Sequence, residues 1–153
     1  MSSDPAPRMQ ECICLAVRQA ARHVTQAYDQ FLAPAGVRTT QFSILAKLKR
    51  KGPMSINALA ADMVMDRTTL GRNILPLERD GLISIARSKE VHLTKLGEKR
   101  FAAACQGWIK AQSRFESAFG SKRASELRAL LRAVVESEFT RSEAEPRHDQ
   151  RHV

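Results

Sequence analysis

The 153-residue chain is poor in aromatic residues, glycine and proline, with one tryptophan, one tyrosine, seven glycines and six prolines. No segment approaches the roughly 20 consecutive apolar residues that a membrane-spanning helix requires. The N-terminal residues include no short apolar core of the kind found in a secretion signal. These absences argue against a membrane-spanning or secreted protein, and we expect the chain to be cytoplasmic with no membrane partner.

Cysteine is also scarce, with three residues, Cys12, Cys14 and Cys105. An odd number of cysteines argues against a disulfide framework. Cys12 and Cys14 are two residues apart, so on a helix they would point to nearly opposite faces and could not share one metal ion. No spacing of histidine and cysteine resembles a zinc site, and we expect neither a metal nor another cofactor. The thiols are interpreted as structural, with a redox sensor acting through any of the three as the alternative.

The residue patterns of an active site are missing as well. There is no nucleophile beside a plausible base, no glycine-rich phosphate loop and no pair of carboxylates at a credible spacing. Ser43, Ser55 and the four histidines belong to no recognisable motif. We therefore predict that the chain is not an enzyme.

Positive charge, in contrast, is abundant. The formal net charge is +9, and residues 47–99 contain eleven Lys or Arg against six Asp or Glu, a net of +5. A basic excess centred on one segment is the electrostatic footprint expected of a nucleic-acid-binding module. A membrane surface would attract the same charge, so the motifs within this segment decide between the two.

The segment from Ser55 to Asp80 predicts two short helices joined by a turn. Ser55 is placed to cap the first helix, Val64 and Met65 form the turn, and Asp66 caps the second helix, where its charge suits the positive end of the helix dipole. Apolar residues recur at the three-and-four spacing of a buried helix face. These inward residues are Ile56, Leu59, Ala60 and Met63 in the first helix and Leu70, Ile74 and Leu77 in the second.

Polar side chains gather at the start of the second helix, at Arg67, Thr68, Thr69, Arg72 and Asn73. In a helix-turn-helix the N-terminal residues of the second helix contact base edges in the major groove. Arginine pairs with guanine, asparagine with adenine, and threonine offers a methyl group to thymine or a hydroxyl group to phosphate. We predict that these five residues contact bases or the groove, with an ordinary solvated helix face as the alternative.

A small β-hairpin is predicted after the second helix. Gly81 occupies the position of a left-handed helix cap, and two apolar runs, 82–85 and 91–93, surround a short polar tip. Helix, helix and hairpin in this order form a winged helix, with Arg87 and Lys89 as the expected wing contacts. Phosphate contacts near helix starts are expected from Thr39, Thr40, Lys47, Ser55 and Asn57.

Long amphipathic helices flank this module. The first is predicted over about residues 9–32, and Thr39 or Thr40 is expected to cap the next helix. After the hairpin, Thr94 is expected to cap a long helix, which breaks at Gly120, and a final helix should reach about residue 140. The apolar stripes of these outer helices exceed what one small core can cover, so we predict that they pair with a second copy in a twofold dimer.

Five segments stand in the order seen in the MarR family of transcriptional regulators: 41–45, 57–60, 66–73, 77–83 and 93–97. The chain resembles this family from about residue 12 to residue 140. The resemblance implies a mainly α fold with a small β-wing, in a single domain over residues 1–153. Its DNA-binding lobe would span about 39–93, between dimerisation helices at about 9–32 and 94–140. The wing departs from the family pattern because it is short and lacks the usual Asp-x-Arg pair.

The resemblance also implies a function. It predicts a homodimeric, sequence-specific regulator, typically a repressor, that leaves a near-palindromic operator when a small ligand binds or a thiol is oxidised. Ligands would occupy a crevice between the dimerisation helices and the winged-helix lobe, and arginine or histidine beside aromatic side chains would suit an aromatic carboxylate. A winged helix that binds another protein is the alternative. The candidate ligand residues are Arg18, Arg22, His23, Gln26, Tyr28 and Trp108.

Overall fold

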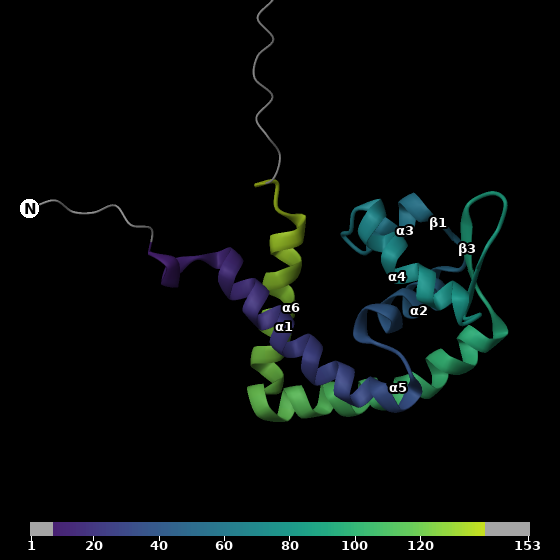
Figure 1. Ribbon diagram of the computed structural model, residues 1–153. Coiled ribbons are helices and arrows are strands. Elements are labelled where there is room, and N and C mark those ends of the chain that lie inside the picture. Colours follow the sequence, from purple (N-terminus) through teal and green to yellow (C-terminus); the bar gives the residue numbers. More distant parts are fainter. Residues whose placement is uncertain (1–7, 140–153) are drawn as a thin grey trace, which may run out of the picture. The chain divides into compact units, whose positions relative to one another are not determined.

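The computed structural model describes residues 8–139, which form helices and one small sheet (Figure 1). The chain divides into two compact units between Ser113 and Arg114. The helices are α1 (Ile13–Leu32), α2 (Thr39–Lys51), α3 (Ile56–Asp62), α4 (Arg67–Arg79), α5 (Lys95–Phe119) and α6 (Ser121–Glu136), with short 3-10 helices at Met9–Glu11 and Ala33–Ala35, and the strands are β1 (Met54–Ser55), β2 (Ile83–Ile85) and β3 (Glu90–Leu93).

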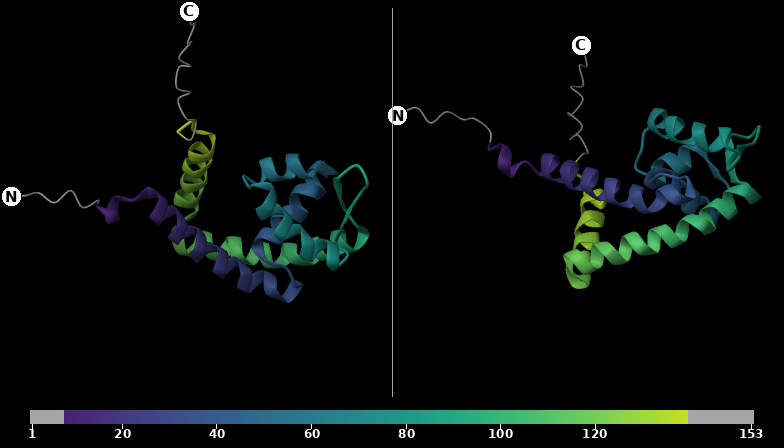
Figure 2. Two further views of the ribbon diagram at one scale, coloured as in Figure 1. Left: turned by 45° about the horizontal axis from the view of Figure 1, so that its top comes forward. Right: turned by 60° about the horizontal axis from the view of Figure 1, so that its bottom comes forward.

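A winged-helix lobe, formed by α2, α3, α4 and the sheet, surrounds one apolar core (Figures 1 and 2). Leu59 from α3 and Leu70 from α4 are fully buried there. Ile56 and Met63 are partly buried and pack against the same core. The predicted inward faces of both short helices are thus confirmed, and so is the mainly α fold with a β-wing.

The predicted caps of α3 and α4 are present. The Ser55 hydroxyl accepts a hydrogen bond from the Ala58 amide at 3.1 Å, and the Asp66 carboxylate accepts one from the Thr69 amide at 2.8 Å. Gly81, with φ of +72°, ends α4 in the left-handed conformation, which only glycine adopts without a steric penalty. These local signals fix where the two helices start and stop.

The prediction that Thr39 or Thr40 caps α2 is wrong. Arg38 is the residue before the helix, and its amide donates to the Gln41 side-chain oxygen at 2.9 Å. The amide and hydroxyl of Thr39 both donate to one carboxylate oxygen of Asp29 at 2.7 Å. The start of α2 is therefore held from α1, by a contact that the local sequence does not reveal.

The sheet has one strand more than the predicted hairpin. Strand β1 pairs with β3, which also pairs with β2, so the antiparallel order is β1-β3-β2. The wing tip is tight, because the Ala86 amide donates to the Glu90 carbonyl and the Lys89 amide donates to the Ala86 carbonyl, each at 2.9 Å. The shortness of the wing is thus confirmed.

Helix α5 begins at the end of the wing and passes the C-terminal end of α1 (Figure 2). As predicted, Thr94 caps it, accepting a hydrogen bond from the Gly97 amide at 3.0 Å. Its fully buried residues are small, Gly97, Ala104 and Ala111, seven residues apart. A Cβ atom at Gly97 would collide with the Leu82 carbonyl, so the small residues allow the helix backbone to lie directly against the lobe.

The start of α1 and the second half of α6 expose apolar side chains. In α1, Ile13 is 71% exposed and Leu32 is the one buried residue. In α6, which lies in the second unit, Leu130 is 65% exposed and Ala124 is the one buried residue. Helix α6 ends at Glu136, earlier than the predicted position near residue 140, because the chain becomes extended at Ser137.

Candidate nucleic-acid interface

Helix α4 has two distinct faces. Leu70, Ile74 and Leu77 fix one face in the core, so a period of 3.6 residues turns Thr68 and Arg72 to the opposite face. Both side chains are exposed, as is Arg67 in the first turn. The structure therefore brings together three of the five residues predicted to contact bases, on the outward side of the helix start.

Thr69 and Asn73, the other two predicted base contacts, already make hydrogen bonds within the helix. The Thr69 hydroxyl donates to the Asp66 carboxylate at 2.7 Å, and the Asn73 amide donates to the Thr69 carbonyl at 2.8 Å. The hydrogen bonds from the backbone and side chain of Thr69 hold the pKa of Asp66 below its usual value. Both residues thus stabilise the helix start, and base contacts by the same atoms would compete with these bonds.

Four of the predicted phosphate contacts lie near helix starts, and two of these four already have internal partners. Thr39 is bonded to Asp29, and Ser55 caps α3. Asn57 is exposed in the first turn of α3, and Thr40 is half-buried beside α4. Ser55 and Asn57 are both exposed, but the Ser55 hydroxyl is already occupied as a helix cap.

Lys47, also predicted to contact phosphate, faces α3. Its Nζ atom lies 2.9 Å from one carboxylate oxygen of Asp62, and Lys51 Nζ lies 2.7 Å from the other. Hydrogen bonds from Lys51 first, and then from Lys47, lower the pKa of Asp62 from 3.8 to about 2. A phosphate group would have to share Lys47 with this ion pair, which ties α2 to α3.

The wing contacts are placed as expected from a short hairpin. Arg87 and Lys89 are both exposed at its tip. Lys89 has a φ of +66°, which turns the chain back toward β3. The Ser88 hydroxyl donates to Glu90 at 3.3 Å beside them. The tip therefore exposes two positively charged side chains on a short loop.

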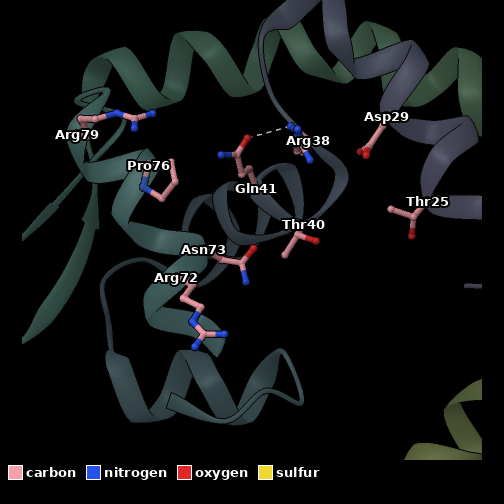
Figure 3. Close-up of a pocket in the computed structure, with 9 residues that line it drawn as sticks. All are labelled: Thr25, Asp29, Arg38, Thr40, Gln41, Arg72, Asn73, Pro76 and Arg79. Carbon is pink, nitrogen blue, oxygen red and sulfur yellow. Dashed lines mark hydrogen bonds between the residues drawn. The ribbon is translucent and has the colours of Figure 1, made fainter. Parts of the chain in front are cut away.

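An open pocket of about 530 Å³ lies between α4, the start of α2 and the end of α1 (Figure 3). Arg72 and Arg79 border it from α4, and Arg38 borders it from the start of α2. Asp29 is the acidic residue in its lining. Sequence reasoning missed Arg38 and Arg79, although the spacing of seven residues between Arg72 and Arg79 indicates a shared helix face. The complete lining is Thr25, Asp29, Arg38, Thr40, Gln41, Arg72, Asn73, Pro76 and Arg79.

None of the six predicted ligand residues lines this pocket. Arg18, Arg22, His23 and Gln26 are exposed along α1. Tyr28 donates its hydroxyl hydrogen to the Gln112 side chain at 2.7 Å, so it joins α1 to α5. These residues therefore lie outside the lining of the pocket beside α4. The sixth, Trp108, is exposed on α5.

The thiols occupy three different environments. Cys12 precedes α1 and accepts a hydrogen bond from the Leu15 amide at 3.4 Å, and Cys14 is exposed. Burial raises the pKa of the Cys105 thiol, which disfavours the reactive thiolate. Within residues 8–139, no three His, Cys, Asp or Glu side chains gather as a metal site would require. None of the described helices is long and apolar enough to cross a membrane.

Comparisons with known proteins identify the family. The family model described as the MarR family matches residues 38–90. An uncharacterised HTH-type transcriptional regulator of Bacillus subtilis, YwoH, is 30% identical over 90 residues, which cover 56% of this chain and 66% of that protein.

Two solved structures of the M. tuberculosis transcriptional regulator MosR extend the match over most of the chain. The first is 33% identical, with a TM-score of 0.72, and covers 83% of this chain and 98% of its own. The second, a complex with DNA, is 32% identical, with a TM-score of 0.70, and covers 83% and 100%. The chain belongs to the MarR family of winged-helix, DNA-binding transcriptional regulators.

Proposed function

We propose that this regulator binds a near-palindromic operator in the cytoplasm as a homodimer, represses transcription there, and is released by a small anionic ligand. The observation that carries the proposal is the outward face of α4, where Arg67, Thr68 and Arg72 are exposed at the start of the second helix of a helix-turn-helix. The complex of the related M. tuberculosis regulator with DNA supports the same mode of action. The family and fold are those of regulators, and we assign no catalytic role.

Arginine and threonine on this face suit the major groove. A guanidinium group pairs with the O6 and N7 atoms of guanine, and a threonine side chain contacts thymine or phosphate. Arg87 and Lys89 at the wing tip would instead contact the phosphate backbone. Contacts of this kind position a protein on DNA without recognising the base sequence. Arg72 and Lys89 should therefore contribute in different ways.

The first prediction separates these two contributions. Arg72→Ala should cost roughly 1–3 kcal/mol on the preferred site and relax the preference at one base pair. Lys89→Ala should weaken binding about equally on preferred and random DNA, and reduce the dependence of affinity on salt. Titrations of both DNA types at several salt concentrations measure this, with Lys110→Ala, an exposed α5 lysine, as the control. Equal losses for both variants on both DNAs would contradict the assigned roles.

The dimer proposal rests on apolar residues that a single chain leaves open. Ile13 of α1 and Leu130 of α6 are more than half exposed, and burying such surface stabilises an assembly. A twofold dimer would cover these helices and place two α4 helices in successive major grooves. We thus propose one functional domain over residues 1–153, with a DNA-binding lobe at about 39–93 and dimerisation helices on either side.

Light scattering at micromolar protein concentration tests the assembly directly. The chain has a mass of 17.1 kDa, so the dimer should give about 34 kDa. A mass of one chain at that concentration would contradict the dimer, whatever the outcome of the DNA experiments.

The ligand proposal rests on the pocket beside α4. Arg38, Arg72 and Arg79 border it against one acidic residue, Asp29, so it favours an anion such as an aromatic carboxylate. Arg72 belongs both to this pocket and to the outward face of α4, so a bound anion would compete with the DNA for the same guanidinium group. This predicts release by direct competition.

Benzoate, titrated into the protein–DNA complex, provides the test. Arg79→Ala lies outside the predicted base contacts and should abolish release while DNA still binds. The double variant Arg22→Ala, His23→Ala changes the site predicted on α1 and should leave release unchanged. The reverse result would move the ligand site to α1, and no release of the parent complex by benzoate would exclude aromatic carboxylates of this type.

Redox sensing is the second candidate function, and the Cys12 cap favours it. Oxidation of Cys12 would alter the group that accepts the Leu15 amide and would loosen the start of α1. The test is DNA binding before and after peroxide, for the parent protein and for Cys12→Ser, which keeps a capping oxygen. A parent protein that binds DNA equally well before and after oxidation would exclude this function.

A further inference from the structure

Helix α4 exposes a large apolar residue on its outward side. Leu75 is 62% exposed, whereas the neighbouring Ile74 and Leu77 are buried in the core. Its position is three residues beyond Arg72 and seven beyond Thr68, so all three lie on one face of the helix. The outward face of α4 therefore contains an apolar contact next to its polar ones.

Gly71 lies one turn before Leu75 on the adjoining part of this face. A Cβ atom added at Gly71 would meet no other atom within 4 Å, so packing inside this chain does not require glycine there. Glycine within a helix lowers its stability, and its presence on the outward face leaves room for a molecule outside the chain. A helical leucine side chain leans toward the preceding turn, which brings the Leu75 methyl groups over this space.

The space beside Leu75 and Gly71 suits a thymine methyl group in the major groove. Among the four bases, thymine alone presents a methyl group there, and proteins recognise it by apolar contact. Arg72, beside this space, would pair with a neighbouring guanine. Thr69 donates a hydrogen bond to Asp66, and Asn73 donates one to Thr69. Leu75 therefore shares the outward face with the exposed side chains of Arg67, Thr68 and Arg72.

We infer that Leu75, with the space left by Gly71, reads the methyl group of a thymine adjacent to the base read by Arg72. This inference rests on the proposed DNA binding and adds a specificity-determining residue to it. It predicts that the preferred site contains a thymine whose methyl group, rather than its hydrogen-bonding atoms, contributes to affinity.

The experiment starts from sites that the full-length protein selects from random duplex DNA. Each thymine of the selected site is then replaced by uracil, which removes the methyl group and keeps base pairing. At one thymine in each half-site, this replacement should weaken the parent protein about fourfold, the value expected for one methyl contact. Leu75→Ala should bind both DNAs equally, and Leu96→Ala, an exposed leucine of α5, should respond as the parent does.

Two further variants sharpen the result. Gly71→Ala adds a methyl group to the outward face and should reduce the same thymine preference, although nothing in the fold opposes it. Thr68→Ser removes the other methyl group on this face and should keep the preference. If Thr68→Ser loses it and Leu75→Ala keeps it, Thr68 reads the thymine and the inference is overturned.

The remaining outcomes are also decisive. Selective binding by the parent protein without any uracil-sensitive thymine would overturn the inference and leave the proposed function intact. Failure of the parent protein to select any sequence would remove the proposed function and this inference together. Because selection precedes the uracil scan, the two failures are distinguished by the step at which they occur.

Discussion

The winged-helix lobe and α6 differ in how completely their apolar side chains are buried. In the lobe, the leucines that face inward, such as Leu59 and Leu70, are fully buried by other elements of the same chain. In α6, Leu130 and Val135 are each more than 60% exposed, and Ala124 is the one buried residue. The lobe therefore completes its core within one chain, whereas α6 has an apolar surface that the second chain of the proposed dimer would cover.

Because of this difference, the stability of the two regions should depend on protein concentration in different ways. Stability of the lobe should depend on its internal packing and be independent of protein concentration. Stability contributed by α6 should depend on assembly, because association favours the folded form in proportion to concentration. A leucine-to-alanine substitution should therefore lower stability by an amount that is independent of protein concentration in the lobe and that changes with protein concentration in α6.

The largest effect is expected from a core leucine. Leu70→Ala should lower the free energy of unfolding by about 2–5 kcal/mol, because it leaves a cavity in a closed core. Leu130→Ala should cost less, and its cost should change with protein concentration. Denaturant unfolding at several concentrations measures both. A concentration-independent cost for Leu130→Ala would contradict the assignment of α6 to an interface.

A glycine pair tests how closely α5 lies against the lobe. Gly97→Ala should cost about 1–3 kcal/mol, because its Cβ would collide with the Leu82 carbonyl and force the backbones apart. Gly71→Ala is the matched control and should be neutral or stabilise by up to about 1 kcal/mol, since its Cβ meets no other atom within 4 Å. Thermal unfolding compares the two. Equal effects would show that α5 does not approach the lobe as described.

The ion pairs of Asp62 should make the lobe sensitive to acid. Because the folded pKa of about 2 lies below the usual 3.8, the contribution of Asp62 is complete above about pH 4 and is lost as the pH falls toward 2. Asp62→Asn should therefore cost about 1–2 kcal/mol near pH 7 and progressively less below pH 4.

The control for this prediction is Glu98→Gln. Glu98 pairs with Lys49 in an exposed site, where solvent screens the interaction, so its loss should cost less than the loss of Asp62. Urea unfolding from pH 7 to pH 2.5 measures both variants. An Asp62→Asn deficit that stays constant over this range would show that the carboxylate does not tie α2 to α3 as an ion pair.

The smallest effect is expected at the turn between α3 and α4. Val64 has a φ of +54° and an exposed side chain, a conformation that is unfavourable for a β-branched residue. Asparagine tolerates it better, so Val64→Asn should stabilise the fold by about 0.5–1 kcal/mol. A lower melting temperature for this variant would contradict strain at the turn.

The sequence predicted those parts of the fold that depend on local signals. Ser55, Asp66, Gly81 and Thr94 mark helix ends through hydrogen bonds or backbone conformations within a few residues, and all four appear as expected. The inward faces of α3 and α4 followed from the spacing of apolar residues. The winged-helix order was therefore accessible without coordinates.

Contacts between distant residues were not accessible in this way. Asp29 holds the start of α2 from α1, and β1 joins the sheet by pairing with a strand far along the chain. The small residues that seat α5, such as Gly97, do not stand out in a hydrophobic pattern.

The residues of the candidate site also divide into those that local sequence signals predicted and those that only long-range packing brings together. Arg67, Thr68 and Arg72 were found from their place at a helix start. Arg38 joins the pocket only through the packing of α2 against α4.

In the proposed dimer, two copies of α4 read DNA as a twofold pair. Hydroxyl-radical footprinting of the protein on DNA selected from a random pool tests it most directly, with Arg72→Ala as the control. A bound dimer should give two protected patches on one face of the duplex, centred about one helical turn apart, and both patches should weaken in Arg72→Ala. A single patch, or uniform protection that Arg72→Ala leaves unchanged, would contradict it.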